Sequence, residues 1–117
     1  MSALAVVNSY YSACDGGGDL SDVPLADRVV FRGPLGRVEG ADDLRVHAAA
    51  RGEMGCTVRE QFLNGNRVCS IVDWRLAGPV ASLTTTEILE VREGRIVSGE
   101  VIFDPASIAG VGGKSQS

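Results

Sequence analysis

Basic side chains, histidine and long apolar runs are all scarce in this sequence. The 117 residues hold 11 lysines and arginines against 15 acidic residues, and a single histidine, which gives a net charge of −4. A surface of this kind has no basic field to neutralise phosphates, so nucleic acid is not expected as a partner. No apolar run approaches the roughly 18 residues that a membrane span requires. A membrane is therefore not an expected partner either.

The sequence has three cysteines, Cys14, Cys56 and Cys69, and they form no C-x-x-C pair. An odd number of widely spaced cysteines does not predict a disulfide framework, and without clustered histidines it does not predict a metal site. The start of the chain carries neither a basic segment nor a long apolar segment of the secretory type. We expect a cytoplasmic protein with no metal and no cofactor.

The length allows one hydrophobic core and excludes two. We expect one domain over residues 1–105 and a disordered tail over 106–117, where Gly110, Gly112 and Gly113 precede terminal serines. The first half has helical spacing of apolar residues. It predicts a helix from Ser2 to Cys14 ended by three glycines, a short helical piece between Asp19 and Asp27, strands at 29–31 and 37–40, and a helix over 42–51.

From Thr57 onward the apolar period changes to two. The alternation and the intervening turn residues predict consecutive hairpins with strands at Thr57 to Leu63, Arg67 to Leu76, Ala81 to Val91 and Arg95 to Phe103. Helices followed by a meander of strands are typical of an α+β fold, in which the helices cover one face of a bent antiparallel sheet.

Two stretches, F31-R-G-P through R37-V-E-G and T86-E-I-L-E-V-R-E-G-R-I-V through F103-D-P, resemble the nuclear transport factor 2-like superfamily in its SnoaL-like and ketosteroid isomerase-like branch. The resemblance covers roughly residues 3–105. It implies a single α+β domain of the cystatin-like barrel type, a cone-shaped curved antiparallel sheet wrapped around N-terminal helices. It also implies an apolar cavity between the helices and the concave face, and a homodimer.

The resemblance further implies three positions that carry chemistry in the isomerase branch. Glu87 matches the acid on the third long strand, and the oxyanion-donating tyrosine of the first helix falls on Tyr11 or, if one glycine of the following loop is an insertion, on Tyr10. The position of the aspartate base is occupied by Gly33, which has no side chain. Isomerisation through that aspartate is therefore not expected here.

Glu87 is also singled out by the pattern of its own strand. Alternation places it with Thr85, Leu89 and Val91, the more apolar set and so the better candidate for the cavity face. Desolvation there favours the protonated form of an acid, which suits it to donate a hydrogen bond or to shuttle a proton. The alternative is a strand-end glutamate that reaches solvent or pairs with an arginine such as Arg75 or Arg59.

His47 shares a helix face with Leu44 and Ala48. Imidazole takes up a proton near neutral pH, so His47 is the candidate to replace the base that Gly33 lacks, with a helix-surface or packing role as the alternative. Trp74 alternates with Val68, Ser70 and Val72, and its indole either stacks on a planar ligand or fills the core. The same two roles apply to the other candidate substrate-binding residues: Phe31, Leu89, Val101 and Phe103.

These observations predict a cofactor-free enzyme that uses acid and base groups to isomerise, cyclise, dehydrate or open a ring in a small, mostly apolar substrate. The alternatives are a non-catalytic ligand-binding or dimerisation module, and an epoxide hydrolase. The last requires Asp73 to point inward beside Arg75, whereas an ion pair across strands on the outer face is the other reading. We expect homodimerisation through the outer face of the sheet, where Ile71, Ile88 and Ile102 alternate away from the cavity.

Overall fold

The computed structural model describes residues 2–50, 54–76 and 82–106, which form two helices and six strands. The helices are α1 (Ala3–Asp15) and α2 (Ala41–Ala50). The strands are β1 (Leu25–Gly33), β2 (Gly36–Glu39), β3 (Gly55–Asn64), β4 (Arg67–Arg75), β5 (Ser82–Arg92) and β6 (Arg95–Ile102). None of the described helices is both long enough and apolar enough to span a bilayer.

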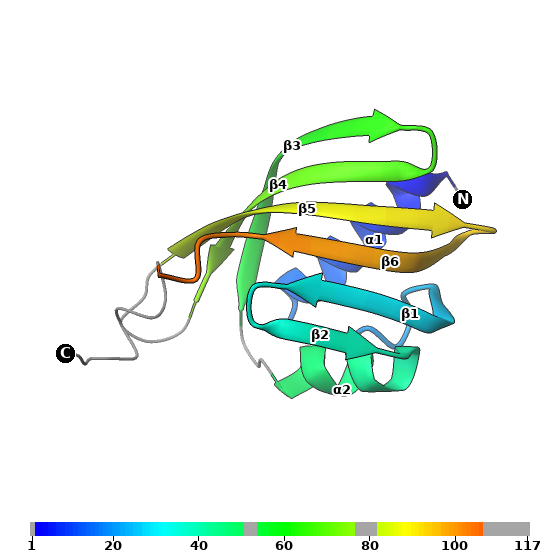
Figure 1. Ribbon diagram of the computed structural model, residues 1–117, viewed down its shortest axis with the longest axis horizontal. Coiled ribbons are helices and arrows are strands. Elements are labelled where there is room, and N and C mark those ends of the chain that lie inside the picture. Colours follow the sequence, from blue (N-terminus) through cyan, green and yellow to red (C-terminus); the bar gives the residue numbers. More distant parts are fainter. Residues whose placement is uncertain (1, 51–53, 77–81, 107–117) are drawn as a thin grey trace.

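The six strands form one sheet in the order β2-β1-β6-β5-β4-β3 (Figure 1). Neighbouring strands are antiparallel except for β1 and β6, which run parallel, with Phe31 opposite Gly99. The expected antiparallel sheet is therefore correct for every pair but this one. The parallel pair arises because the chain leaves β1 through the β2 hairpin and α2, builds β3 to β5, and returns along the free edge of β1.

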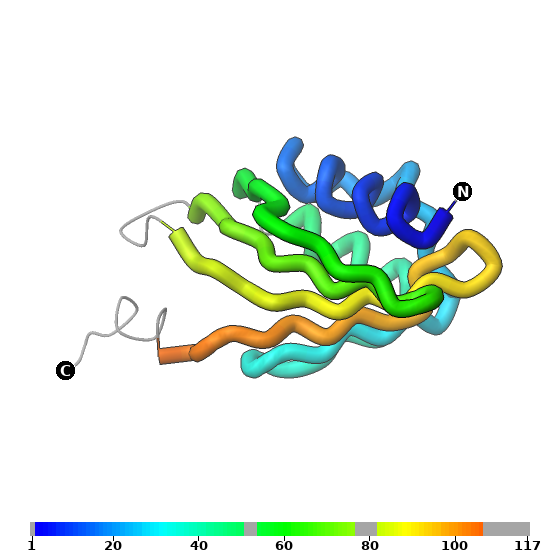
Figure 2. Tube along the Cα trace, turned by 90° about the horizontal axis from the view of Figure 1, so that it is seen from above, coloured from blue at the N-terminus to red at the C-terminus, as the bar shows by residue number. Residues whose placement is uncertain are grey.

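Both helices lie on the same side of the curved sheet, so neither of them covers the other side (Figure 2). Helix α1 begins where the Ser2 hydroxyl oxygen accepts a hydrogen bond from the Ala5 backbone N–H at 3.1 Å, as expected for an N-cap. Its apolar stripe packs against the inner side of the sheet and forms the core. Fully buried members of this core are Val6, Val7, Val29, Ala48, Val68, Val72, Leu89 and Ile96.

The short helical piece expected between Asp19 and Asp27 is wrong. The chain makes a turn at residues 21–23 and enters β1 at Leu25, whose register partner is Ile96. The Pro24 carbonyl accepts a hydrogen bond from the Ile96 backbone N–H at 3.0 Å. These backbone groups pair with a distant strand, and such tertiary pairing overrides weak local helix signals. The expected tail over 106–117 and the expected turn between the strands at 67–76 and 81–91 fall almost wholly outside the described residues.

Strand β3 contains a bulge that changes which of its side chains face the helices. Val58 lies opposite Val72, and the next pair is Glu60 opposite Ile71, so Arg59 is an extra residue in the ladder. A one-residue insertion exchanges the two faces of a strand beyond it. As a result Glu60 lies on the outer face and Gln61 on the inner face, opposite Ser70.

Candidate functional site

A cavity of about 480 Å³ lies between the helices and the concave face of the sheet. The exposed Leu35, Arg37 and His47 line it where it meets solvent, and we call this end the mouth. Most of the remaining wall is apolar. It is formed by Tyr10, Phe31, Arg32, Gly33, Gly36, Val38, Leu44, Met54, Trp74, Leu76, Leu83, Thr85, Glu87, Val101 and Phe103.

Glu87 is the one acidic residue among the described residues of this wall and is 2% exposed. Strand β5 presents it inward together with Thr85, Leu89 and Val91, all of them buried, as the alternation predicts. Its Oε1 accepts a hydrogen bond from the Tyr11 hydroxyl at 2.9 Å. A buried carboxylate is strongly disfavoured unless donors replace its lost water, and Tyr11 supplies the first of them.

Two further donors meet the other carboxylate oxygen of Glu87. The Trp74 indole N–H donates to Oε2 at 3.1 Å, and the Thr85 hydroxyl donates to the same atom at 2.7 Å. Trp74 also donates to the Thr85 oxygen at 3.1 Å, so the threonine accepts from the indole and passes its own proton to the carboxylate. Because an indole N–H can only donate, Oε2 must act as an acceptor in this arrangement.

Tyr11 is hydrogen-bonded to Glu87 but is not part of the cavity wall. Burial, with the charge of Glu87 as the next cause, raises the pKa of the Tyr11 phenol far above its usual range. The phenol therefore stays neutral and serves as a permanent donor to the carboxylate. The sequence left open which of the two tyrosines contacts the acid. In the structure Tyr11 is hydrogen-bonded to Glu87, and Tyr10 lines the cavity.

Tyr10 contributes its ring to an aromatic corner of the cavity. Its centroid lies 5.1 Å from that of Tyr11 in an edge-to-face arrangement and 5.5 Å from that of Phe31. These separations are typical of favourable aromatic pairs. Phe31 itself lies directly over Gly99, where an added Cβ would meet the ring at 2.6 Å. The absence of a side chain at position 99 therefore makes room for the aromatic corner.

Four of the five expected substrate-binding residues, Phe31, Trp74, Val101 and Phe103, line the cavity. Leu89 does not, because it lies two residues further along β5 and is wholly buried in the core. Sequence reasoning did not single out Thr85 as a site residue. Strand alternation could have identified it, because Thr85 precedes Glu87 by two positions and therefore lies on the same face of β5.

His47 extends from α2 to the mouth and lines both this cavity and a second hollow that it shares with Arg37. The histidine is exposed, whereas Glu87 is buried. The cavity thus carries two groups able to transfer protons in different surroundings, a carboxylate within the wall and an imidazole at the mouth. Among the described residues no three of His, Cys, Asp and Glu gather closely enough to hold a metal ion.

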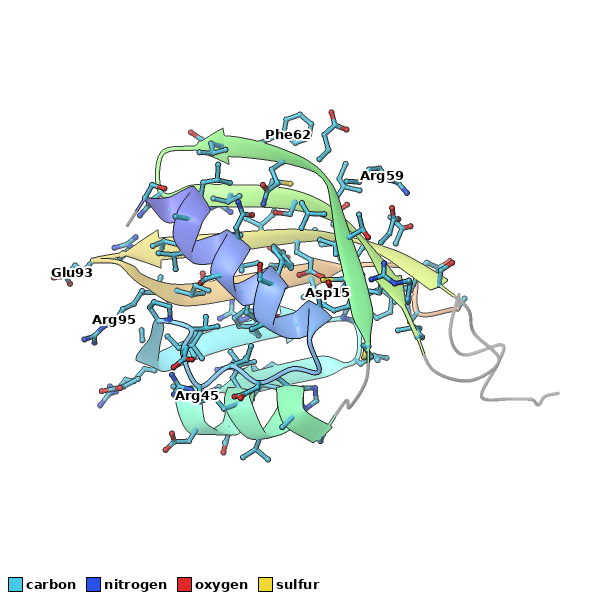
Figure 3. All side chains as sticks on the ribbon, turned by 180° about the vertical axis from the view of Figure 1, so that it is seen from behind. Asp15, Arg45, Arg59, Phe62, Glu93 and Arg95 are labelled. Atoms are coloured by element: carbon cyan, nitrogen blue, oxygen red, sulfur yellow. The ribbon has the colours of Figure 1, made fainter. Side chains whose placement is uncertain are left out.

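Asp73 and Arg75 do not pair with each other. Asp73 accepts hydrogen bonds from Arg59 of the neighbouring strand at 2.7 Å and from the Thr84 hydroxyl at 2.6 Å, whereas Arg75 pairs with Asp15 at 2.9 Å. Figure 3 shows Arg59 extending outward from β3, and Asp15 at the end of α1. Asp73 is not part of the cavity wall. The aspartate that epoxide hydrolysis would require thus lies on the outer face.

Comparison with known proteins places these features in context. A family model described as a SnoaL-like domain matches residues 7–99. No curated protein matches the chain. A Cytophaga hutchinsonii NTF2-like protein of unknown function superposes with a TM-score of 0.83 at 23% identity, over 93% of this chain and 96% of that one.

Two other solved structures share the fold at lower identity. A Mycobacterium tuberculosis epoxide hydrolase of the LEH-like type gives a TM-score of 0.75 at 20% identity, over 92% of this chain and 82% of that one. A Catenulispora acidiphila protein with a ketosteroid isomerase-like fold, in complex with trimethylamine, gives 0.73 at 14% identity over 88% of each chain. At such identities the likeness concerns the fold alone.

Proposed function

The chain belongs to the SnoaL-like domain family, and from that premise we propose that it is a cofactor-free enzyme that moves protons on a small, mostly apolar substrate. The observation that supports this most directly is Glu87, a buried carboxylate that forms part of an apolar cavity wall and is held by three donors. Fold alone does not give function, so the proposal depends on this site.

Glu87 is best suited to accept the proton. Tyr11 and Trp74 both direct a hydrogen at the carboxylate, and their positions are fixed by α1 and β4. In the proposed reaction Glu87 removes a proton from a carbon beside a substrate carbonyl, and the electron pair of the broken C–H bond moves toward the carbonyl oxygen. Return of the proton to another carbon completes an isomerisation. Transfer of the same proton from Glu87 to a β-hydroxyl, which leaves as water with the electron pair of its C–O bond, completes a dehydration.

His47 lines the mouth of the same cavity, and in the proposed reaction it donates a hydrogen bond to the developing oxyanion. The sequence alone predicts the opposite roles for these two residues, with His47 as base and the Glu87–tyrosine pair as oxyanion donor. Both versions use the same groups. They differ in whether Glu87 gains the proton or supplies one.

Glu87→Gln separates the two versions, because a glutamine amide can donate a hydrogen bond but cannot take up a proton. The assay is incorporation of deuterium from D₂O beside the carbonyl of small cyclic ketones and enones, followed by mass spectrometry. If Glu87 is the base, exchange falls about 10²- to 10⁴-fold in Glu87→Gln and less in His47→Ala. If His47 is the base, the order of the two losses is reversed.

Glu90→Gln is the matched control, since it makes the same change on the outer face of the same strand, where Glu90 pairs with Arg92. It should leave exchange unchanged. A protein that exchanges no ketone of the panel above the rate of Glu87→Gln contradicts the enzymatic proposal.

Ligand binding without turnover is the second candidate function. A carboxylate beside the rings of Trp74, Tyr10 and Phe31 is the combination that attracts an alkylated ammonium group, through charge and through the faces of the rings. The Catenulispora relative was crystallised with trimethylamine. Calorimetric titration with trimethylamine and bulkier tertiary amines tests this candidate. Binding that Glu87→Gln abolishes, in a protein without proton exchange, would favour it.

A further inference from the structure

A row of polar side chains crosses the inner face of the sheet and ends on Glu87. Gln61 lies opposite Ser70 in the register of β3 and β4, and Ser70 lies opposite Glu87 in the register of β4 and β5. Helix α1 covers this row, with Asn8 above Gln61 and Tyr11 above Glu87. The row begins at the exposed Asn8 and reaches Glu87 from the side away from the cavity.

From Gln61 onward the hydrogen bonds of this row point toward Glu87, whereas the bond from Gln61 to Asn8 points away from it. The Gln61 amide donates one N–H to the Asn8 side-chain oxygen at 3.0 Å and the other to the Ser70 hydroxyl at 3.1 Å. Ser70 accepts from Gln61, so its own proton is available to the Tyr11 oxygen, and this bond works to lower the pKa of the phenol against the larger effect of burial. Tyr11 in turn donates to Glu87.

Ser70 is wholly buried and lies between Val68 and Val72 on the same face of β4. A third valine would fill such a position without a polar group to satisfy, since a buried hydroxyl must be hydrogen-bonded or it destabilises the fold. A core requirement alone therefore does not account for a serine here. Nor does it account for Gln61, which reaches the inner face only because of the bulge at Arg59.

We propose that Gln61 and Ser70 are positioning residues that fix the direction of this donor chain and so control how readily Glu87 takes up a proton. The inference rests on the proposed role of Glu87 as proton acceptor. Hydrogen bonds in series polarise one another, by roughly 10–30% per bond. A chain that points at the carboxylate therefore stabilises its ionised form, and breaking the chain should make protonation easier.

Other titratable groups also face Glu87 and remain unchanged in the test. They are Tyr10 and Tyr11 from α1 and Cys56 from β3, while His47 of α2 and Arg32 and Arg37 of β1 and β2 line the same cavity. The effect of the chain is therefore measured as a difference between variants that share all of these groups.

Trp74 provides the readout, because it is the only tryptophan in the chain and its indole N–H is bonded to Glu87. Its emission is recorded against pH in the full-length protein without substrate. Glu87→Gln identifies the transition that belongs to Glu87, since it removes that transition. Ser70→Ala and Gln61→Met then break the chain at two places, and Phe62→Met makes a comparable change at the neighbouring, outward position of β3.

Both Ser70→Ala and Gln61→Met should move the midpoint of this transition upward by roughly 0.1 to 0.7 pH units, which is the cooperative share of one charge-assisted bond. Phe62→Met should leave it unchanged. A midpoint that stays in place or moves down in both variants, with circular dichroism showing them folded, overturns the proposal. A transition that persists in Glu87→Gln overturns it as well. Failure of the proposed enzymatic function appears separately, in the ketone exchange, and leaves this titration intact.

Discussion

Tyr11 and Glu87 lie 76 residues apart in the chain and are joined by a 2.9 Å hydrogen bond from the phenol to the carboxylate. The bond connects the first helix to β5, a strand inside the sheet with β4 and β6 on either side. It fixes the rotation of α1 on the sheet and satisfies a buried acid at the same time. One contact thus contributes both to the stability of the fold and to the chemistry of the cavity.

Removal of this bond should destabilise the protein without changing the cavity wall. Hydrogen bonds to charged groups contribute about 1.5–3 kcal/mol, so we expect Tyr11→Phe to lower the free energy of unfolding by about that amount in urea denaturation. A double-mutant cycle with Glu87→Gln should give a coupling energy of about 0.5–3 kcal/mol. Fully additive effects would mean that the two residues do not interact in solution.

The free energy of unfolding should decrease as the pH rises above the ordinary pKa values of a thiol and a phenol. Burial, followed by the nearby Cys14, raises the pKa of the Cys56 thiol from 9.0 to about 12, and the pKa of Tyr11 is raised as well. Above pH 9 the unfolded chain releases the thiol proton while the folded chain keeps it, so ionisation favours unfolding. The free energy of unfolding should fall by about 1.4 kcal/mol per pH unit for each such group.

Urea denaturation between pH 7.5 and 11 measures this slope. Cys56→Ala should remove the part that begins near pH 9, and Tyr11→Phe the part that begins near pH 10, the ordinary values of a thiol and a phenol. Cys69→Ala is the control, because Cys69 is only half-buried and lies on the outer face. A slope that is the same in all three variants would contradict the assignment.

The outer face of the sheet should mediate homodimerisation. Phe62, Cys69 and Ile88 lie opposite one another across β3, β4 and β5, beside Ile71 and Ile102. Phe62 is 54% exposed and Ile102 is 48% exposed, and Figure 3 shows Phe62 extending beyond the edge of β3. Neither helix covers this face, and a contiguous apolar surface of this kind is typical of an interface.

Light scattering at micromolar concentration should therefore give twice 12.2 kDa. Ile88→Lys should return the protein to a monomer, because a buried ammonium without a partner is strongly disfavoured at an interface. Val46→Lys is the control, since Val46 is also an aliphatic residue at the surface, 70% exposed, but lies on α2. A monomeric wild-type protein would contradict this prediction.

Local periodicity was enough to predict both helices, most strand boundaries and the inward position of Glu87, because those depend on which way neighbouring side chains point. The partner of Glu87 was not predictable in this way. Tyr10 and Tyr11 are both buried, and which phenol reaches the acid depends on the rotation of α1 against a sheet formed by residues far along the chain.

Tertiary geometry also decided two further features. The bulge at Arg59 leaves no mark in a pattern of only ten residues, yet it determines that Gln61 and not Glu60 faces the helices. The partner of Asp73 was open for a similar reason. Arg59 reaches it from the adjacent strand, whereas Arg75 lies too far along the same strand and pairs with the end of α1.

Gly33 offers the sharpest test of how the cavity is used. It lines the cavity, its φ lies outside the left-handed region, and an added Cβ would meet Val101 at 3.5 Å, an ordinary contact. A side chain is therefore tolerated at position 33, where the isomerase branch that this sequence resembles has its base.

We expect Gly33→Asp to fold and to raise deuterium exchange in the Glu87→Gln protein by about 10²-fold or more, because it supplies a carboxylate to the same cavity. Gly33→Ala in the same background provides the matched control and should restore nothing. If Gly33→Asp folds and exchange stays at the level of Glu87→Gln, then a carboxylate in this cavity is not sufficient for proton transfer, and ligand binding without turnover becomes the better account of the site.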